Sequence, residues 1–465
     1  MCMQRARKRG LEAWASEPRR KPLILRGARQ VGKSYLARTW GEERFRVVIE
    51  ANLERRPELA GCFVDNDPRA TLRRLEVAVG KAIPCDGSAL LFLDEIQAAP
   101  QVLAKLRWFA EELPDLALIA AGSLLDFALL DPEVATPVGR ITFLHLEPMG
   151  FEEFCLALGE EPLVRWLGEE VTGERIAAGT AMPDELHGHA LALFRTWLLV
   201  GGMPAAVEAF RVERSLLGVA AVQRDLLATL RDDFAKYSGR VPHDRLRRVL
   251  DSVPQQLGGK FTYRRVDRDE RASGLKQAVE LLTLARVCHR CSATPARGVP
   301  LAAGADDSAF KLLHLDVGLA STSLGLDLAA LEKAADLTLV NQGAVAEQAV
   351  GQLLRLTFAA NDEPRLFWWQ REKRGSEAEL DFVHALGSRV IPIEVKAGKT
   401  GTLKSLHGFM AERALPLALR VNSAPPLLND LTLSTLFGTA SYRLLSIPAY
   451  LVEQAPRLLG EAGTR

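Results

Sequence analysis

Residues 27–34 read Gly-Ala-Arg-Gln-Val-Gly-Lys-Ser, a complete GxxxxGK[ST] phosphate-binding loop. An apolar run at 22–25 predicts a buried strand before the loop, and residues 35–40 predict a helix after it. Backbone N–H groups of such a loop, with the positive end of the helix, offer donors to a polyphosphate. We expect Lys33 to reach the β- and γ-phosphates and the Ser34 hydroxyl to bind Mg²⁺. The residues predicted to contact ATP here are Gly27, Ala28, Arg29, Gln30, Val31, Gly32, Lys33 and Ser34.

A second pattern lies about 60 residues after the loop, where the apolar run 89–93 ends in Asp94 and Glu95. It is typical of a buried parallel strand whose C-terminal end meets a ligand. We expect Asp94 to hold Mg²⁺, directly or through water, and Glu95 to polarise the attacking water. Residues 46–50 predict another strand between the two motifs. That order is similar to the AAA-type branch of phosphate-loop ATPases.

Two further polar residues are candidates for contacts with the nucleotide. A strand predicted at 116–121 ends in Gly122-Ser123, and Ser123 is either a sensor of the γ-phosphate or part of an ordinary turn. Arg140 would neutralise transition-state charge as an arginine finger or sensor. The alternative for Arg140 is a solvated surface arginine.

Composition sets the class of protein. A chain of 465 residues predicts about three domains, and 48% hydrophobic with 25% charged residues is typical of a soluble globular protein. The formal charge of +1 argues neither for nor against a polyanionic partner. No run approaches the roughly 18 apolar residues that span a bilayer, and no apolar segment follows the basic N-terminus. We therefore expect no membrane association and a cytoplasmic location.

The six cysteines are scattered through the chain, which predicts reduced thiols. Cys288 and Cys291 have metal-ligand spacing, but no second Cys/His pair follows at a suitable distance. Structural zinc needs four ligands, so we interpret this pair as thiols on a strand.

The middle of the chain has a helical pattern from about 151 to 233, broken at 201–204, which would suit a lid over a nucleotide. Residues 240–300 then carry 13 Lys/Arg against 6 Asp/Glu. A helix, a short strand at Thr262-Tyr263, two helices and a strand pair ending near Pro300 are the elements of a winged helix-turn-helix. The charge suits DNA phosphates, although solvated helix faces or a protein interface explain it equally well.

The last part of the chain holds a second set of polar residues. A strand predicted at 391–396 puts Glu394 and Lys396 on one face, because strand side chains alternate. Asp381 lies on an earlier strand, and Glu347 lies on a helix predicted at 343–356. This order of helix Glu, strand Asp and Glu-x-Lys is similar to PD-(D/E)XK nucleases. In such a site Asp381 and Glu394 would bind Mg²⁺, with Glu347 and Lys396 completing the catalytic set.

These motifs together resemble the bacterial and archaeal ATPases that join an AAA-type core to a C-terminal domain of unknown function with a PD-(D/E)XK-like fold. The resemblance implies an α/β protein with ATP and Mg²⁺ as cofactors. This sequence differs from the family pattern at Arg140, where relatives often have Lys, and at Gln348, where many have Asn. The stretches that carry it are 25–34, 91–97, 121–123, 137–154, 199–204, 233–237, 311–319, 343–347, 378–382 and 392–396.

The predicted domains are an AAA-type P-loop ATPase core at 1–155, a helical lid at 156–240, a winged helix-turn-helix at 241–325 and a nuclease-like domain at 326–465. Two functions follow. In the first, ATP hydrolysis drives a molecular switch that acts on DNA through the winged helix and the nuclease-like domain. In the second, ATP controls binding to a protein partner or DNA, and the nuclease-like domain does not cut. The sequence fixes no oligomeric state.

Overall fold

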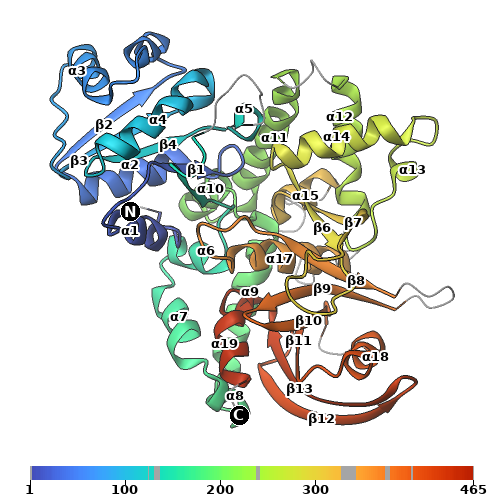
Figure 1. Ribbon diagram of the computed structural model, residues 1–465. Helices are drawn as coiled ribbons and strands as arrows, with labels where there is room; N and C mark the ends of the chain where they lie inside the picture. Colours follow the sequence, from blue (N-terminus) through green and yellow to red (C-terminus); the bar gives the residue numbers. More distant parts are fainter. Residues whose placement is uncertain are drawn as a thin grey trace. The chain divides into compact units, whose positions relative to one another are not determined.

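The computed structural model describes residues 3–123, 125–129, 137–236, 241–325, 342–371, 378–398 and 402–463. The chain forms two compact units (Figure 1). The N-terminal unit contains residues 1–147, 284–286 and 358–363, and the C-terminal unit contains 148–283, 287–357 and 364–465. Apart from the two short segments, the predicted lid, winged helix and nuclease-like domain all fall in the C-terminal unit. Their predicted boundaries at 240/241 and 325/326 border residues 237–240 and 326–341, which lie outside the described residues.

The N-terminal unit is built on a five-stranded sheet in the order β2-β3-β4-β1-β5, with every neighbouring pair parallel. Its elements are α1 (Lys8–Ala15), β1 (Leu23–Arg26), α2 (Lys33–Arg44), β2 (Val47–Asn52), α3 (Pro68–Val79), β3 (Ala89–Asp94), α4 (Gln101–Glu112), β4 (Ala117–Ala121), α5 (Leu125–Leu129) and β5 (Thr142–His145).

Helices on both faces of this sheet explain why β3 is apolar from Ala89 to Leu93. Leu91 and Leu93 pack in the core that α3 and α4 share with the sheet. The neighbouring residue Leu90 faces α2, since a Cβ placed on Gly41 would lie 2.6 Å from its Cδ2. A strand covered on both faces must be hydrophobic at every position, whereas a half-exposed strand would alternate.

The order of the strands places the two predicted nucleotide motifs at one edge of the sheet. The phosphate loop follows β1, and Asp94 ends β3, so both lie at the carboxyl ends of parallel strands. The strand predicted at 46–50 exists as β2, but it lies at the sheet edge beyond β3. The strand between β1 and β3 is β4, whose end leads to Ser123.

The C-terminal unit begins with helices. They are α6 (Phe151–Leu158), α7 (Glu161–Arg165), α8 (Gly173–Ala177), α9 (Asp184–Val200), α10 (Pro204–Glu213), α11 (Leu216–Asp232), α12 (His243–Ser252), α13 (Tyr263–Val266) and α14 (Ala272–Leu284). The helical pattern predicted over 151–233 is thus present. The prediction of a strand at Thr262-Tyr263 is wrong, because Tyr263 begins helix α13. The strand-like contact lies one residue earlier, where Phe261 N donates to Phe310 O (2.8 Å).

The predicted break at 201–204 separates α9 from α10, and packing explains it. A Cβ on Gly202 would lie 2.0 Å from Met149 O, so a side chain has no room there. Gly202 N also donates to Oδ2 of the fully buried Asp316 (2.6 Å), which caps α15 (Val317–Ser323). The break is therefore a close backbone contact held by one buried carboxylate.

The rest of the C-terminal unit is an eight-stranded mixed sheet in the order β12-β13-β11-β10-β9-β8-β6-β7. Because β6 pairs with β8, the hairpin assigned to the predicted winged helix continues the sheet of the predicted nuclease-like domain. That hairpin ends at His314 rather than near Pro300. The remaining elements are β6 (Cys288–Ala293), β7 (Asp306–His314), α17 (Gln342–Leu356), β8 (Leu366–Gln370), β9 (Glu379–Leu386), β10 (Arg389–Val395), α18 (Lys404–Arg413), β11 (Leu417–Asn422), β12 (Leu427–Thr435), β13 (Gly438–Pro448) and α19 (Ala455–Ala462).

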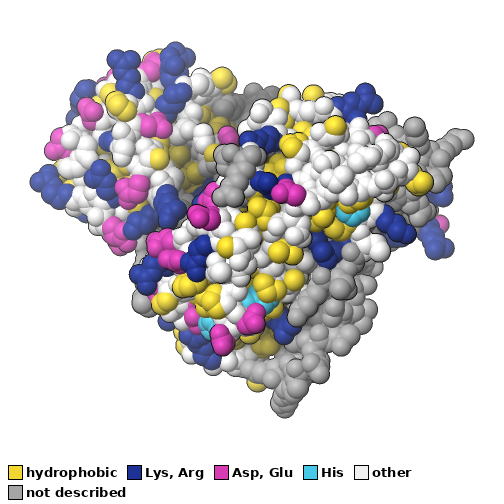
Figure 2. Space-filling view, turned by 90° about the horizontal axis from the view of Figure 1, so that it is seen from below, with side chains coloured by type: hydrophobic (Ala, Val, Ile, Leu, Met, Phe, Trp, Pro, Cys, Tyr) yellow, Lys and Arg dark blue, Asp and Glu magenta, His cyan; other side chains and the backbone are white. Residues whose placement is uncertain are grey.

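The surface carries mixed charge. On the face shown in Figure 2, Lys and Arg side chains are interspersed with Asp and Glu, in keeping with the formal charge of +1. Within the described part of the chain, no helix has the length and apolar character needed to cross a membrane.

Candidate functional site

The phosphate loop joins β1 to α2 in a conformation that requires glycine at its start. A Cβ on Gly27 would lie 2.2 Å from Leu146 O, which no other residue could accept without moving the backbone. The loop is also held from outside, because Nη1 of the buried Arg5 donates to Val31 O (2.6 Å) and its Nη2 to Glu147 O (2.6 Å). Packing and hydrogen bonds of the protein alone therefore define the loop.

Lys33 folds back over this loop. Its Nζ donates to Gly27 O (3.0 Å) and Ala28 O (2.7 Å), and the side chain is buried. Burial lowers the pKa of Lys33 to about 8, although the carboxylates of Glu95 and Asp94 act in the opposite direction. A buried ammonium that donates to two carbonyl oxygens would gain strongly from an anion placed in the loop.

Ser34 and Asp94 meet as the sequence predicts. Ser34 Oγ donates to Asp94 Oδ1 (2.8 Å), and Asn52 Nδ2 donates to Asp94 Oδ2 (3.1 Å). Burial raises the pKa of Asp94, and the Ser34 hydrogen bond opposes that effect. A hydroxyl and a carboxylate side by side are the oxygen donors that Mg²⁺ prefers, so these residues fit that ion. Sequence analysis missed Asn52, whose signal is its place at the end of β2, in register with Asp94.

Glu95 is held beside the end of β4. It adopts a left-handed conformation (φ 51°), and Gln97 Nε2 donates to its Oε2 (2.5 Å). Gln97 also lies against Gly122, the residue after β4, since a Cβ on Gly122 would lie 2.2 Å from Gln97 Oε1. The next residue, Ser123, has a buried Oγ without a hydrogen-bond partner among the described residues. Gln97 thus connects the predicted water-activating carboxylate to the predicted sensor strand.

Arg140 lies apart from this group. Its Nε donates to Glu111 Oε1 on α4 (2.7 Å), and about half of the side chain is exposed. Together with Lys105, Arg107 and Trp108 it borders a surface hollow of about 530 Å³. The structure therefore pairs Arg140 with Glu111 on α4, and its role at a nucleotide stays a prediction.

An ion-pair network that sequence analysis missed lies behind the loop. The buried Arg286 donates from Nε to Asp126 Oδ2 (2.8 Å) and from Nη2 to Glu363 Oε1 (3.2 Å). Asp126 also pairs with Arg26 at the end of β1 (2.9 Å). Burial acts to lower the pKa of Arg286, but Asp126 and its other acidic neighbours outweigh burial and raise it. Arg286 has a positive φ of 60°, so a strained backbone is retained where this ion pair forms.

The four residues predicted for a nuclease-like site lie in one part of the C-terminal unit. We call this group of residues, Glu347, Asp381, Glu394 and Lys396, the carboxylate centre. Val395 N donates to Asp381 Oδ2 (2.7 Å), and Lys396 Nζ donates to Glu394 Oε1 (2.6 Å). The predicted helix and strands are present as α17, β9 and β10.

Lys311 on β7 is the member of the carboxylate centre that sequence analysis missed. Its Nζ lies 3.1 Å from Glu347 Oε2, 3.9 Å from Asp381 Oδ1 and 3.8 Å from Glu379 Oε1. Its side chain is only 3% exposed. Burial acts to lower the pKa of Lys311, but Glu347, Asp381 and Glu379 outweigh it and raise the pKa, so the ammonium stays charged. A lysine inside the apolar run of β7 was the available signal, because a buried lysine needs carboxylate partners.

The carboxylates of this centre are held close to protonation. Burial, and next the charge of Asp381, raise the pKa of Glu347 to about 8 and the pKa of Glu394 to about 7. Lys311 opposes the shift at Glu347, and Lys396 opposes it at Glu394.

The centre does not fit the metal that a PD-(D/E)XK site implies. Glu347 and Asp381 share an ammonium, and Glu394 Oε1 accepts from Lys396. Glu394 Oε2 is buried and has no hydrogen-bond partner among the described residues. No three His, Cys, Asp or Glu side chains of the described residues form a group that could hold a metal ion. The structure thus brings Asp381 and Glu394 together, but not as a set of metal ligands.

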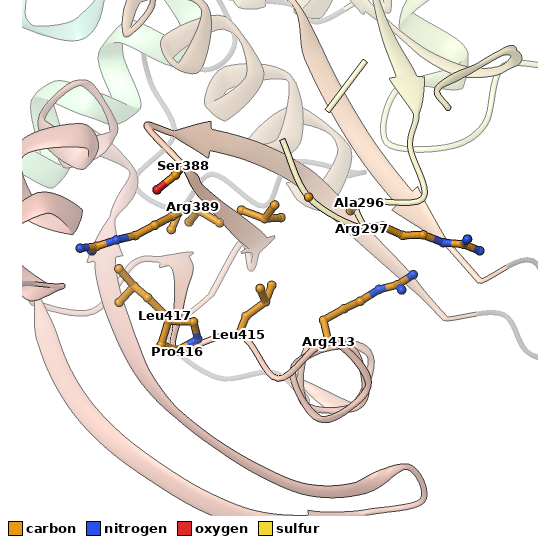
Figure 3. Close-up of a pocket in the computed structure, with 11 residues that line it drawn as sticks. Ala296, Arg297, Ser388, Arg389, Arg413, Leu415, Pro416 and Leu417 are labelled. Atoms are coloured by element: carbon orange, nitrogen blue, oxygen red, sulfur yellow. The ribbon is translucent and has the colours of Figure 1, made fainter. Parts of the chain in front are cut away.

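A pocket of about 240 Å³ lies at the opposite end of β10 from Glu394 (Figure 3). Apolar residues of β10 and β11 line it together with three arginines. Arg297 and Arg413 extend to one side in Figure 3, and Arg389 extends to the other. Arg413 Nη2 donates to Pro295 O (2.9 Å). The pocket is therefore separate from the carboxylate centre.

The cysteines and the basic span also have defined places. Cys288 and Cys291 are buried on β6 as free thiols, and burial raises the pKa of both.

In the basic span, residues 240–300, Arg245 pairs with Glu270, and Arg248 pairs with Asp267 and Glu270. The exposed arginines of the α13–α14 segment are Arg264, Arg265, Arg268 and Arg271.

Comparison with known proteins identifies the class of the N-terminal unit. Residues 19–155 match the model of an AAA domain family. With the parallel sheet and the phosphate loop, this match makes the unit AAA-type and ATPase-like. Two domains of unknown function, DUF8612 and DUF4143, match residues 191–330 and 342–423. The first of these ranges crosses the predicted boundaries at 240/241 and 325/326.

Solved structures resemble the chain weakly, and no curated protein matches it. A Walker-type ATPase of Pyrococcus abyssi is 17% identical, with a TM-score of 0.45, covering 70% of this chain and 96% of that one. The Aeropyrum pernix ORC1 protein in complex with DNA is 15% identical, with a TM-score of 0.29, covering 71% and 95%. Cdc6p of Pyrobaculum aerophilum is 14% identical, with a TM-score of 0.24, covering 62% and 89%.

Proposed function

We propose that the chain is a Mg²⁺-dependent ATPase that works as a molecular switch. The observation that carries this proposal is the hydrogen bond between Ser34 Oγ and Asp94 Oδ1 beside the buried ammonium of Lys33. The loop supplies N–H donors for the phosphates, and Lys33 supplies the charge that faces the β- and γ-phosphates.

The remaining residues of the site have separate roles in this proposal. Ser34 and Asp94 would hold Mg²⁺, which neutralises phosphate charge when bound. Glu95 accepts a proton from the attacking water, and Gln97 fixes the orientation of its carboxylate. Ser123, with its unpartnered hydroxyl at the end of β4, senses the γ-phosphate.

Phosphate release with Mg·ATP tests the proposal. Wild-type protein should hydrolyse ATP, and Lys33→Ala should abolish hydrolysis by removing nucleotide binding. Chelating divalent cations with EDTA should stop turnover in the wild type. Turnover that survives either change would refute the proposed site.

We further propose that the switch acts on DNA through the four exposed arginines of the α13–α14 segment. Their side chains are free to contact phosphates, whereas Arg245 and Arg248 are occupied by carboxylates. The helix order α12, α13, α14 followed by the β6–β7 hairpin supports a winged-helix role for this segment. A protein partner that binds the same surface is the alternative.

A salt titration of duplex DNA affinity separates these alternatives. Each phosphate contact steepens the log–log slope by about 0.9, so Arg264→Gln and Arg268→Gln should each reduce it by about that amount. Arg69→Gln, an exposed change on α3, is the matched control and should leave the slope unchanged. A flat wild-type slope would favour the protein partner.

For the C-terminal part, we propose a PD-(D/E)XK-like fold that binds DNA or a protein partner and does not cleave nucleic acid. The succession of Glu347 on α17, Asp381 on β9 and Glu394 on β10 supports the fold. The pairing of these carboxylates with lysines favours a function without cleavage. Incubating plasmid and single-stranded DNA with the protein and Mn²⁺ should leave both intact, and cutting lost in Asp381→Asn would restore the nuclease hypothesis.

A further inference from the structure

Lys311 lies where a bridging cation would have to sit in the carboxylate centre. Its ammonium is within 4 Å of oxygens of Glu347, Glu379 and Asp381, which come from one helix and one strand. Mg²⁺ binds carboxylate oxygens at about 2.0–2.1 Å, whereas Nζ lies 3.1 Å from Glu347 Oε2 and 3.9 Å from Asp381 Oδ1, so an ion shared by the two carboxylates would have to draw them inward and displace Nζ from between them.

The structure holds this ammonium in place. Its Nζ lies 5.1 Å from the centroid of the Trp368 ring, which adds a cation–π contact on a second side. The end of β7 is fixed to α17, because Gln348 accepts from His314 N (2.8 Å) and donates to His314 O (2.9 Å). Gly258 lies against Glu347, since a Cβ on it would be 3.2 Å from Oε1. Both partners of the Lys311–Glu347 pair are thus held by their surroundings.

Electrostatics opposes a second cation beside the first. Two charges of like sign a few ångströms apart repel strongly in a buried site, and both oxygens of Asp381 already face a donor. Glu394, the other predicted ligand, has its own ammonium partner in Lys396. In their present arrangement Glu347, Glu379 and Asp381 do not form a metal-binding group. Removing Lys311 would leave them without their common counter-charge, and we expect them then to close around a divalent cation.

We propose that the Lys311 ammonium takes the place of a divalent cation in the carboxylate centre, which is therefore closed to Mg²⁺ and Mn²⁺. Lys311 acts as a positioning residue that joins β7, α17 and β9 through charge. The proposal does not rest on ATP hydrolysis, and it gives a physical reason for the non-cutting function proposed above for the C-terminal part.

Mn²⁺ titration of the nucleotide-free, full-length protein tests this, with free Mn²⁺ followed by electron paramagnetic resonance. Ser34→Ala is the background for all variants, so that the phosphate-loop site contributes no ion. This background protein and its Asp381→Asn variant should bind the same number of Mn²⁺ ions. Lys311→Met should gain one site, with a dissociation constant at least tenfold lower than any site in its parent, and adding Asp381→Asn should remove it.

Two results would overturn the proposal. One is a Mn²⁺ site in the background protein that Asp381→Asn abolishes, and the other is a folded Lys311→Met variant that gains no site. If Lys311→Met fails to fold, Lys311→Gln replaces it, because the neutral amide still donates to Glu347 and leaves all three carboxylates in place, and the same gain of one site is expected. A failure of ATP hydrolysis leaves all these results unaffected, since no nucleotide is present.

Discussion

Ser34 Oγ and Asp94 Oδ1 are joined by a hydrogen bond of 2.8 Å across 60 residues of sequence. One oxygen begins the helix after the phosphate loop, and the other ends the buried strand β3. The contact forms because parallel strands bring their carboxyl ends to one edge of a sheet. It places the two predicted Mg²⁺ ligands side by side.

Glu95→Gln should separate nucleotide binding from hydrolysis. The amide keeps the size of the side chain but cannot accept a proton from water, so the rate should fall by roughly 10²–10⁴-fold while the affinity for ATP changes little. Single-turnover phosphate release together with nucleotide binding would measure both. Glu112→Gln, an exposed change on α4, should preserve the wild-type rate. A Glu95→Gln enzyme of normal rate would exclude Glu95 as the base.

The affinity for ATP should fall as the pH rises above about 8. Burial lowers the pKa of Lys33 to about 8, so free protein loses the loop ammonium above that pH and must take up a proton to bind the nucleotide. The dissociation constant should then rise by up to tenfold per pH unit between 8 and 10. Lys33→Arg cannot lose its charge in this range, and any affinity it retains should be independent of pH. An equally steep loss in Lys33→Arg would assign the titration to another group.

The sequence predicted well those features of the fold that depend on a local pattern of residues. The apolar runs of β1, β3 and β4 and the alternation of β9 and β10 predicted the strands, and the apolar run before Asp94 also predicted a buried parallel strand. The position of β2 at the sheet edge could not be predicted in this way, because strand order depends on how the connections cross the sheet. Tyr263 was assigned wrongly because two residues are too few to distinguish a strand from the start of a short helix.

The side chains that sequence missed are those whose partners are distant in the chain. Arg286 meets Asp126 across 160 residues, and Lys311 meets Glu347 across 36. No spacing rule connects such pairs, since the contact depends on which strand or helix lies alongside. The local signal was that Arg286 and Lys311 each stand in an apolar stretch of sequence. Such a residue needs a partner of opposite charge, but the sequence does not indicate which residue that partner is.

Arg286→Met should destabilise the N-terminal unit by about 3 kcal/mol, because it leaves Asp126 and Glu363 facing a partly buried site without their shared cation. Urea unfolding would measure the change. Arg107→Met breaks an exposed ion pair with Glu111 and should leave the unfolding midpoint unchanged. Equal midpoints for the two variants would show that the buried network contributes nothing.

Gly202→Ala and Gly188→Ala should have opposite effects on stability. The methyl group at 202 would overlap Met149 O, at a cost of about 3 kcal/mol, and would disturb the hydrogen bond to Asp316. Gly188 lies inside α9 with nothing within 4 Å of its added Cβ, so alanine there should stabilise by about 0.5–1 kcal/mol. Thermal unfolding of both variants provides the measurement, and a destabilised Gly188→Ala would contradict the packing described for α9.

Glu394→Gln should remove part of the pH dependence of stability. The folded protein keeps the Glu394 proton up to about pH 7, whereas the unfolded chain releases it near 4.5, so the folded state loses relative stability as the pH rises between these values. Glu394→Gln should therefore match the wild type near pH 4.5 and exceed its Tm by a few degrees at pH 8. Glu112→Gln serves again as the control. A Tm difference that is the same at both pH values would show that Glu394 is ionised throughout.

Calorimetry with Mg²⁺ and a non-hydrolysable ATP analogue tests the central claim most directly, namely that the loop and the end of β3 bind a magnesium nucleotide together. We expect saturable binding at one site per chain, and its loss in Lys33→Ala. We also expect Ser34→Ala to bind more weakly in Mg²⁺ but as well as the wild type in EDTA. Folded wild-type protein that shows no binding, or that binds with equal affinity after Lys33→Ala, would contradict the account.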